Sequence, residues 1–498
     1  MFIQISRLLS LMIFIHLLIS CGEKDNRPNV LFIAIDDLRP ELGCYGNGVI
    51  KSPNIDRLAS EGILFRHHYV QVPTCGASRC ALLTGRRPWS KAHVKNSVMA
   101  ELMSGQPEAD KPETFVHHLR RNGYYTLGIG KISHSADGLV YGYEDPVSDQ
   151  LELPHSWDER LFDHGKWGTG WNAFFGYADG SNRQGMKKQV KPYEKGEVGD
   201  EGYPDGLSTK LAVQKLGELK SKGKPFFMGV GYFKPHLPFT APAKYWDLYD
   251  QSEMALPPVN DIPEGISEKS LHGSGEFNQY ALGEEKASLD SSLSEDYIRK
   301  VKHAYAACVS YTDAQVGILL TELKNLGLEE NTIVVIWGDH GWHLGDQRVW
   351  GKHTLSEYAL RSALIMKIPG QQQRGGVIES VVESVDIYPT LMDLCQVDIP
   401  EGLDGQSFIN KISADKMVVP DVAYAYWRDG ISIRTDTFRL TKYFREAEPT
   451  VELYDYFSDP GESKNLAASR PEKVNQLMPL LNKIDHQFYL EDETDQEN

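Results

Sequence analysis

The feature that most constrains the fold is a continuous apolar run, NVLFIAI, that stops abruptly at the acidic pair Asp36-Asp37. Six consecutive apolar residues after Asn29, without alternating polar positions, predict a strand buried on both faces, as in a parallel sheet covered by helices. The stretch SPNIDRLASEGILF follows with helical spacing up to Ile63, and Ser52 or Asn54 is its candidate N-cap. A strand followed directly by a helix is the unit from which parallel sheets are built.

The same alternation continues along the chain. ETFVHHLRRNG is a second amphipathic helix with a glycine stop, and a long helix is expected around Val301–Leu323. Further strands are expected at YYTLGIGK, PFFMGVGYFKPHLPF, NTIVVIWGDHG and ALIMKIPG. This pattern predicts the α/β class, with a large, mostly parallel sheet flanked by helices. The stretches 135–205 and 245–295 lack sustained periodicity and are expected to be long loops framing a cleft.

The residue pattern of the sequence changes after about Gly405. AYAYWRDGISIRTDTFRLTKYF and VELYDYFSD are typical of short alternating strands, and PEKVNQLMPLLNKIDHQF is typical of a helix. We therefore expect a large domain over residues 28–405 and a smaller C-terminal α+β subdomain over residues 406–498.

The N-terminal segment has the form of an export signal. Arg7 precedes an apolar run, LLSLMIFIHLLIS, that ends at Cys21. LLISC resembles a bacterial lipobox, which predicts removal of residues 1–20 as a lipoprotein signal peptide and lipidation of Cys21. An ordinary cleaved signal is the alternative. We expect an exported bacterial lipoprotein in the periplasm or at the outer membrane and cell surface, held to the membrane only through Cys21.

Charge and cysteine content exclude some classes of protein. The chain has 69 acidic and 52 basic residues and a net charge of -17, which argues against a nucleic-acid binder because phosphate neutralisation needs a basic surface. A pocket can still be locally basic. The 6 cysteines are too few for a disulfide scaffold, and the pairing of Cys44, Cys80, Cys308 and Cys395 cannot be read from their spacing.

Two polar pairs follow apolar strands directly. Asp36-Asp37 and Asp339-His340 both occupy positions where open α/β sheets bind ligands, at the carboxyl ends of strands. Three carboxylates and one histidine suit Ca²⁺, or less well Mg²⁺, better than Zn²⁺. Each pair alone could equally be a turn former or a helix cap.

A short motif of the sequence contains a cysteine beside small residues and an arginine. CGASR, followed by LLTGR, resembles the signature of the sulfatase family, C-x-(P/A)-x-R, in which the cysteine is oxidised to formylglycine. Similarity extends to the segments DDLRP, GIGKISH, GYFKPHLPF, IWGDHGWHLGD, WGKHTLSE and ELYDYFSDPGESKNLA, and it is greatest to the iduronate-2-sulfatase-like branch. The resemblance implies an alkaline phosphatase-like fold and hydrolysis of sulfuric esters by a formylglycine made from Cys75.

The resemblance also assigns roles to residues. The metal ligands implied are Asp36, Asp37, Cys75 as formylglycine, Asp339 and His340. Arg79 would steady the formylglycine, Lys131 would neutralise its alkoxide, and His134 would be the base for its second hydroxyl. His236 and Lys352 would grip the sulfate, and one of them would protonate the leaving oxygen. Taken singly, such lysines and arginines are usually surface charges and such histidines structural, so the joint pattern carries the assignment.

Substrate recognition is predicted from two further positions. Arg39 and Trp342 lie beside the sugar carboxylate in the iduronate-2-sulfatase-like pattern, and an arginine fork suits a carboxylate. This favours a sulfated polysaccharide or oligosaccharide that contains uronic acid, of glycosaminoglycan or ulvan type. The aromatic run from Trp167 to Tyr177 is either a sugar-stacking platform or core.

Other interpretations remain open at this point. Ala77 stands where the family motif more often has proline, which affects which formylglycine-generating maturase would act on it. A phosphatase or phosphonate monoester hydrolase would share the fold, and an inactive carbohydrate-binding lipoprotein would share the pocket. Cys75 and Cys80 could instead form a disulfide or a soft metal site.

Overall fold

The computed structural model describes residues 25–108, 113–371, 375–413, 422–445 and 447–490. The predicted signal peptide and Cys21 lie outside the described residues. Within the described part of the chain, we find no helix that combines the length and apolar character required of a membrane span.

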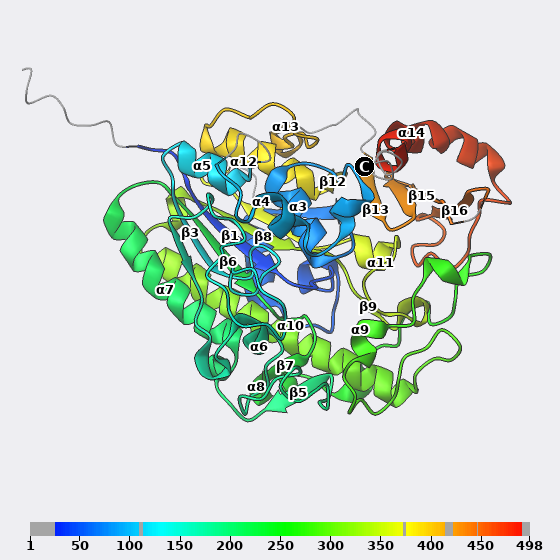
Figure 1. The fold of residues 1–498 in the computed structure, drawn as a ribbon, viewed down its shortest axis with the longest axis horizontal. Helices are drawn as coiled ribbons and strands as arrows, with labels where there is room; N and C mark the ends of the chain where they lie inside the picture. The colour runs from blue at the N-terminus through cyan, green and yellow to red at the C-terminus, as the bar shows by residue number, and fades with distance from the viewer. Residues whose placement is uncertain (1–24, 109–112, 372–374, 414–421, 446, 491–498) are drawn as a thin grey trace, which may run out of the picture.

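The core of the fold is an eight-stranded sheet in the order β12-β2-β11-β8-β1-β6-β3-β4 (Figure 1). Its strands are β1 (Asn29–Ile35), β2 (Ile63–Tyr69), β3 (Tyr125–Gly130), β4 (Glu159–Leu161), β6 (Phe226–Tyr232), β8 (Thr332–Gly338), β11 (Leu364–Lys367) and β12 (Gly376–Glu383). β11 runs antiparallel to both β8 and β2, and all other neighbours are parallel. The prediction of a mostly parallel sheet is confirmed.

Helices cover both faces of this sheet, as Figure 1 shows. One face carries α2 (Pro53–Glu61), α7 (Pro204–Lys222) and α10 (Glu295–Asn325), and the other carries α3 (Cys75–Thr84), α4 (Val98–Met103), α5 (Phe115–Arg121) and α12 (Ile387–Cys395). β1 supplies both cores, because Leu31, Ile33 and Ile35 join the first cluster and Val30 and Phe32 the second. Each of these aliphatic or aromatic side chains contributes roughly 1.5–3 kcal/mol by leaving water.

The predicted helix over residues 52–65 is too long. α2 ends at Glu61, and Ile63 begins β2, where it pairs with β11 and β12. Gly62 makes the join, because a Cβ there would lie 2.4 Å from the carbonyl oxygen of Met366. Strand pairing therefore outweighs the helical spacing of Ile63.

The N-terminus of α2 is capped from another element. Ser52 occupies the N-cap position, as one of the two predictions had it, but its side chain makes no capping hydrogen bond. Instead, the Asp313 carboxylate of α10 accepts from the backbone amides of Asn54 at 3.0 Å and Ile55 at 2.8 Å. A carboxylate at a helix N-terminus also complements the helix dipole. Sequence spacing could not identify this cap, because it comes from a residue far along the chain.

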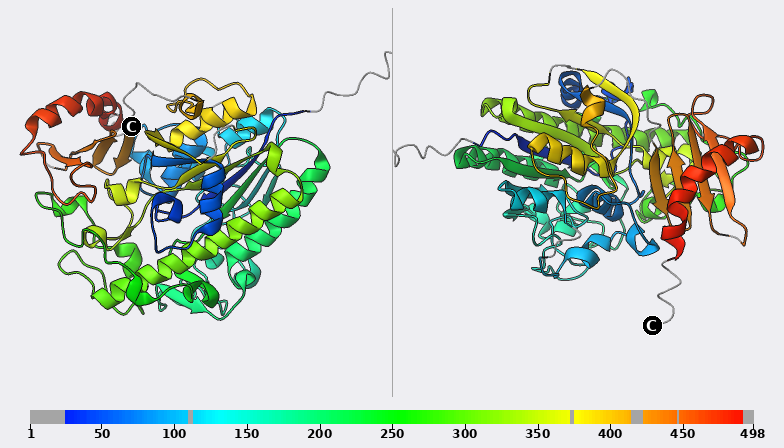
Figure 2. Two further views of the ribbon diagram at one scale, coloured as in Figure 1. Left: turned by 180° about the vertical axis from the view of Figure 1, so that it is seen from behind. Right: turned by 90° about the horizontal axis from the view of Figure 1, so that it is seen from above.

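A second, smaller sheet follows near the C-terminus. It is antiparallel and consists of β13 (Ala423–Trp427), β14 (Gly430–Arg434), β15 (Phe438–Tyr443) and β16 (Thr450–Asp455), with α14 (Pro471–Leu490) beside it (Figure 2). Ile431, Leu440 and Leu453 belong to the same apolar cluster as the α3 face of the large sheet. The smaller sheet is thus packed on the main core, and the predicted short strands and final helix of the C-terminal region are present.

A buried ion-pair network ties the two sheets together. Glu357, in α11 (Glu357–Leu360), accepts from Arg439 at 2.8 Å and from the Tyr69 hydroxyl at 3.0 Å, and it lies 3.6 Å from Arg434. Burial opposes ionisation, yet the two arginines lower the pKa of Glu357 to about 2. The carboxylate therefore stays charged in the folded protein far into the acid range.

We expect Glu357→Gln to lower the free energy of unfolding at pH 7 by about 3 kcal/mol, as the depressed pKa implies. The pKa of Glu357 is lower in the folded protein than in the unfolded chain, where it is about 4.5. The ionised carboxylate therefore stabilises the folded protein fully above pH 4.5, and this stabilisation is lost as the pH falls toward about 2. Urea unfolding of both proteins at pH 7 and pH 3.5 measures it. The matched control, Glu379→Gln, changes a carboxylate that is 64% exposed and should have almost no effect. An equal deficit at both pH values would contradict the account.

Candidate active site

Four adjacent parallel strands bring polar residues to one edge of the sheet. Residues that follow the carboxyl ends of β3, β6, β1 and β8 meet there, as open α/β sheets favour. They are Lys131 and His134 after β3, His236 after β6, Asp36 and Asp37 after β1, and Asp339 and His340 after β8. Because Ile35 is in register with Gly338, the two acidic pairs lie side by side.

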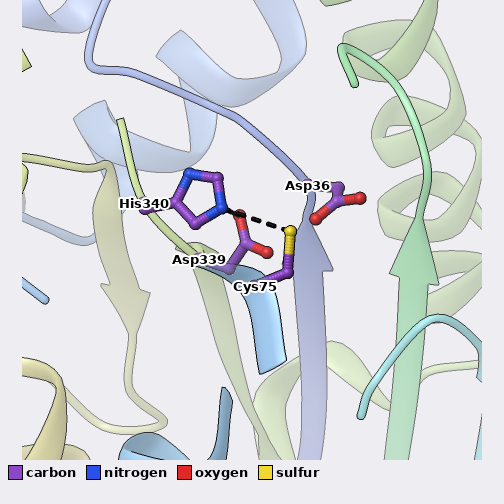
Figure 3. A group of neighbouring side chains, drawn as sticks. All are labelled: Asp36, Cys75, Asp339 and His340. Atoms are coloured by element: carbon purple, nitrogen blue, oxygen red, sulfur yellow. Dashed lines mark hydrogen bonds and ion pairs between the residues drawn. The ribbon is translucent and has the colours of Figure 1, made fainter. Parts of the chain in front are cut away.

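Cys75 opens α3 in front of this edge, and its side chain points toward Asp36, Asp339 and His340 (Figure 3). Its Sγ lies 3.3 Å from Nε2 of His340 and 3.3 Å from Nζ of Lys352. Burial raises the pKa of the thiol to about 12, so the unmodified cysteine stays protonated at neutral pH. Cys75 as it stands is therefore a poor nucleophile.

Backbone packing explains the glycine of the CGASR motif. The Gly76 amide donates to Oδ1 of Asn96 at 2.9 Å, and a Cβ at this position would lie 2.2 Å from the Asn96 carbonyl oxygen. The Thr74 hydroxyl donates to the same Oδ1 at 3.0 Å. Asn96 thus fixes the start of α3 and the position of Cys75.

Two cations hold the carboxylates in place. Arg79 lies 3.2 Å from Asp36 and 2.9 Å from Asp339, and Lys131 Nζ lies 2.6 Å from Asp36. Burial opposes the charge of Asp36, but Lys131 and Arg79 hold its pKa well below the usual range. Arg79 also donates to the carbonyl oxygens of Lys131 and Ile132, so it links the two carboxylates to the segment that follows β3.

The cluster fits a hard divalent cation. Ligand atoms of Asp36, Cys75, Asp339 and His340 all lie within 4.8 Å of one another. Asp37 Oδ2 is buried without a hydrogen-bond partner, and burial raises the pKa of this carboxyl despite Lys352 nearby. An oxygen-rich set with an unpartnered carboxylate oxygen suits Ca²⁺ or Mg²⁺. The structure therefore brings together all the predicted metal ligands.

The other predicted catalytic residues line a cavity of about 430 Å³ that opens above Cys75. Lys352 Nζ lies 2.9 Å from Asp37, and although burial opposes its charge, Asp37 and Cys75 help to raise its pKa well above the ordinary value. His134 carries an unpartnered Nδ1, and burial, with Lys131, lowers its pKa well below the ordinary value. Burial and Lys352 lower the pKa of His236 to about 4.

The loops predicted to frame a cleft do so, and they supply residues that the motifs did not reveal. Glu276 receives a contact from Nε2 of His236 at 3.0 Å and lies 3.7 Å from Lys352. Tyr143 and Arg183 come from the first loop region and also line the cavity. No motif marks these positions; the only signal was the absence of periodicity around them.

The assignment of Arg39 and Trp342 to the sugar carboxylate is corrected. Arg39 forms ion pairs with Asp346 at 2.7 Å and Glu41 at 3.0 Å, and it donates to the Trp342 carbonyl oxygen at 2.9 Å. Trp342 is completely buried, and neither residue lines the cavity. The guanidinium is paired with two carboxylates of the protein, and it lies outside the cavity.

Two open questions about side chains are also answered. Cys44, Cys75, Cys80, Cys308 and Cys395 are all free, so the Cys75–Cys80 disulfide is wrong. The aromatic run is mainly core: Trp167, Trp171, Phe174 and Phe175 pack in one buried cluster, and Tyr177 packs in the larger core cluster. Trp171, Phe174 and Phe175 also line the cavity.

Known families and relatives match most of the chain. The family model "Sulfatase" matches residues 28–397, and the model "N-sulphoglucosamine sulphohydrolase, C-terminal" matches residues 338–487. Iduronate 2-sulfatase of Mus musculus is 31% identical over 413 residues, 75% of this chain and 69% of the relative. The ulvan-active sulfatase of Formosa agariphila is 27% identical over 499 residues, covering 94% of this chain and 84% of the relative.

A solved structure shows the same fold. It is a protein in complex with its substrate D-glucosamine-2-N,6-O-disulfate, with a TM-score of 0.69 and 23% identity, and the match covers 93% of this chain and 98% of that one. The family model spans most of the chain, and the relative of highest identity named above is an iduronate 2-sulfatase. The chain therefore belongs to the sulfatase family of sulfuric ester hydrolases, with similarity to its iduronate 2-sulfatase branch.

Proposed function

We propose that the protein removes O-sulfate groups from a sulfated saccharide by means of a formylglycine made from Cys75. The observation that carries this is the position of Cys75, buried at the start of α3 in contact with Lys352 and His340 and within 4.8 Å of the Asp37 carboxylate. A protonated thiol has no evident use in that position, whereas a precursor of an oxygen nucleophile has one.

The chain's own residues would divide the work as follows. A formylglycine hydrate at position 75 would supply the nucleophile, and a divalent cation held by Asp36, Asp37, Asp339 and His340 would polarise the sulfate ester. Lys352, with its raised pKa, keeps a positive charge where the sulfate oxygens would lie. We assign the cation as Ca²⁺, since oxygen ligands prevail in the cluster.

Two histidines are placed for proton transfer. His134 is neutral at pH 7 because of its lowered pKa, and its free Nδ1 can accept a proton from the residue at position 75. His236 contacts the Leu237 carbonyl oxygen through Nδ1 at 2.6 Å, which leaves Nε2 on the side of Glu276 and the cavity. We assign Nε2 of His236, with Lys352, to the leaving sugar oxygen.

The substrate class and the location belong to the same proposal. The names of the relatives, iduronate 2-sulfatase and ulvan-active sulfatase, favour a uronic-acid-containing polysaccharide or oligosaccharide. The lipobox at Cys21 favours an exported lipoprotein, and the alanine at position 77 favours a maturase that accepts it in place of proline. Both expectations rest on sequence.

Initial rates on 4-nitrophenyl sulfate and 4-nitrophenyl phosphate test the reaction class. The protein should be made with a maturase that converts Cys75. We expect kcat/KM for the sulfate to exceed that for the phosphate by at least about 100-fold, since specificity is a difference in transition-state binding. Faster phosphate hydrolysis would assign a phosphohydrolase, and binding of sulfated saccharides without hydrolysis of either ester would assign a binding protein.

A further inference from the structure

Arg183 forms part of the cavity wall and is almost completely buried, with 3% of its surface exposed. It lies in the loop between α6 (Gly170–Phe174) and β5 (Tyr193–Gly196), and its amide donates to the Phe175 carbonyl oxygen at 3.1 Å. The guanidinium carbon lies 3.6 Å from the centroid of the Phe175 ring and 5.4 Å from that of Tyr280. Its Nε donates to Gln184 at 3.0 Å. The side chain is therefore held firmly in one orientation.

Arg183 differs from the other buried arginines of the described chain in lacking a carboxylate partner. Arg39 pairs with Asp346 and Glu41, Arg79 with Asp36 and Asp339, Arg434 with Glu357, and Arg439 with Glu357 and Glu462. No carboxylate of the described residues lies within ion-pair distance of Arg183, although the protein as a whole is strongly acidic. Among the described residues, each buried arginine thus pairs with a carboxylate except Arg183, which faces the cavity.

An unpaired buried cation is costly. Removing a charge from water carries a desolvation penalty, and stacking on aromatic rings offsets only part of it. A partner that is absent from the protein but present in a ligand would complete this site. An arginine fork binds a carboxylate or a sulfate through two parallel hydrogen bonds.

Arg183 is connected to the catalytic cluster through two adjacent rings. Nζ of Lys131 lies 4.5 Å from the centroid of Phe174, and the rings of Phe174 and Phe175 are 4.8 Å apart. The guanidinium of Arg183 in turn lies over the ring of Phe175. The two cations therefore flank a short aromatic wall of the same cavity as Cys75, with room beside it for a sugar ring.

The rest of the cavity has the same sign of charge. Arg428, in the turn between β13 and β14, and Arg445, just after β15, line it together with Lys269. Glu276 is the one acidic residue among the described residues that line the cavity, and it contacts His236 and lies near Lys352. The cavity is thus a locally basic site in an acidic protein, which favours ligands with more than one negative group.

We propose that Arg183 binds a second anionic group of the substrate, a carboxylate or a further sulfate, apart from the sulfate that is cleaved. This deepens the proposed function and depends on it. The preferred substrate is accordingly a saccharide with at least two anionic groups, and a neutral sulfate ester lacks one of the two contacts.

The test is Arg183→Met, which keeps the bulk of the side chain and removes the charge. The substrates are a sulfated uronate-containing disaccharide, the same disaccharide with its carboxyl group reduced to the alcohol, a disaccharide with a second sulfate, and 4-nitrophenyl sulfate. We expect kcat/KM for at least one doubly anionic disaccharide to fall by about 30-fold or more, mainly through KM, because a buried charge-assisted contact is lost. The aryl sulfate should lose far less. If activity falls on the uronate-containing disaccharide but not on its reduced form, Arg183 binds the carboxylate. If it falls on the disaccharide with a second sulfate, Arg183 binds that sulfate.

The matched control is Arg39→Met, a buried arginine with carboxylate partners outside the cavity. It should lower the unfolding temperature by several degrees, because it leaves Asp346 unpaired, and should not change the ratio of the two kinds of substrate. Arg183→Met should not lower the unfolding temperature of the ligand-free protein. Equal losses on all substrates, or a destabilisation like that of Arg39→Met, would overturn the proposal. If the parent protein hydrolyses no sulfate ester, it is the proposed function that fails. In that case, a lower unfolding temperature of Arg183→Met would show that Arg183 is a structural residue, and an unchanged one would show that it is not.

Discussion

Replacing Cys75 with alanine is expected to lower kcat/KM for aryl and saccharide sulfates by about 10⁴-fold or more, as removal of a covalent nucleophile does in other enzymes. The side chain is 2% exposed and its Sγ has polar neighbours at 3.3 Å, so alanine removes one atom from a rigid site. The folded structure should persist, and circular dichroism with thermal unfolding checks this. Initial-rate measurements with 4-nitrophenyl sulfate give the activity.

Cys80→Ala is the matched control for this substitution. Cys80 is also buried in α3, but it belongs to the apolar cluster on the α5 and α12 side of the sheet and does not line the cavity. Its removal should cost some stability and leave most of the activity, because only packing is lost. Full activity of Cys75→Ala would exclude a nucleophile at position 75, whatever the behaviour of the control.

Removal of divalent cations is expected to abolish sulfate hydrolysis and to lower the unfolding temperature. Asp36, Asp37 and Asp339 place three carboxyl groups together, and without a cation the Asp37 carboxyl, whose pKa is raised by burial, tends to take up a proton. A ligand at 100 times its dissociation constant stabilises by about 2.7 kcal/mol. Dialysis against EDTA, followed by thermal unfolding with and without added Ca²⁺ or Mg²⁺, measures the effect.

The variant Asp37→Asn separates a metal site from a general salt effect. It removes the charge of the carboxylate whose Oδ2 has no hydrogen-bond partner within the described protein, and keeps the shape of the side chain. We expect its unfolding temperature to respond little to Ca²⁺, while that of the parent protein rises. An unfolding temperature of the parent that is the same with EDTA and with Ca²⁺ would show that no such site is occupied.

Residues at strand ends could be predicted from the sequence because their geometry is set locally. An apolar strand that stops at Asp36-Asp37 or at Asp339-His340 leaves little freedom in where those side chains lie. Parallel neighbours then bring the strand ends to one edge of the sheet. The family motif added Cys75, which sequence spacing alone could not have placed beside them.

Residues that depend on distant partners could not be predicted. Arg39 follows the strand that carries the metal ligands, but Asp346 neutralises it, and nothing in the local sequence announces that pair. Glu276 and Arg183 come from loops without periodicity, whose course is fixed by tertiary contacts. For the same reason, the pairing of Ile63 in β2 was missed, because its partners lie some 300 residues away.

Charge distribution shows the same limit on a larger scale. The net charge of -17 describes the whole surface and argues against a nucleic-acid binder, yet the cavity is lined by six lysines and arginines and one glutamate. Composition averages over these two environments. Only the fold shows that residues from 131 to 445 contribute to one basic site.

The mass of the tryptic peptide that ends at Arg79 and contains Cys75 tests the central claim most directly. The protein should come from a host with a maturase that accepts alanine at position 77. Conversion to formylglycine predicts a peptide lighter by roughly 18 daltons than the thiol form, because sulfur and two hydrogens are replaced by one oxygen. A peptide with an intact thiol, from protein that hydrolyses sulfate esters at full rate, would contradict the account.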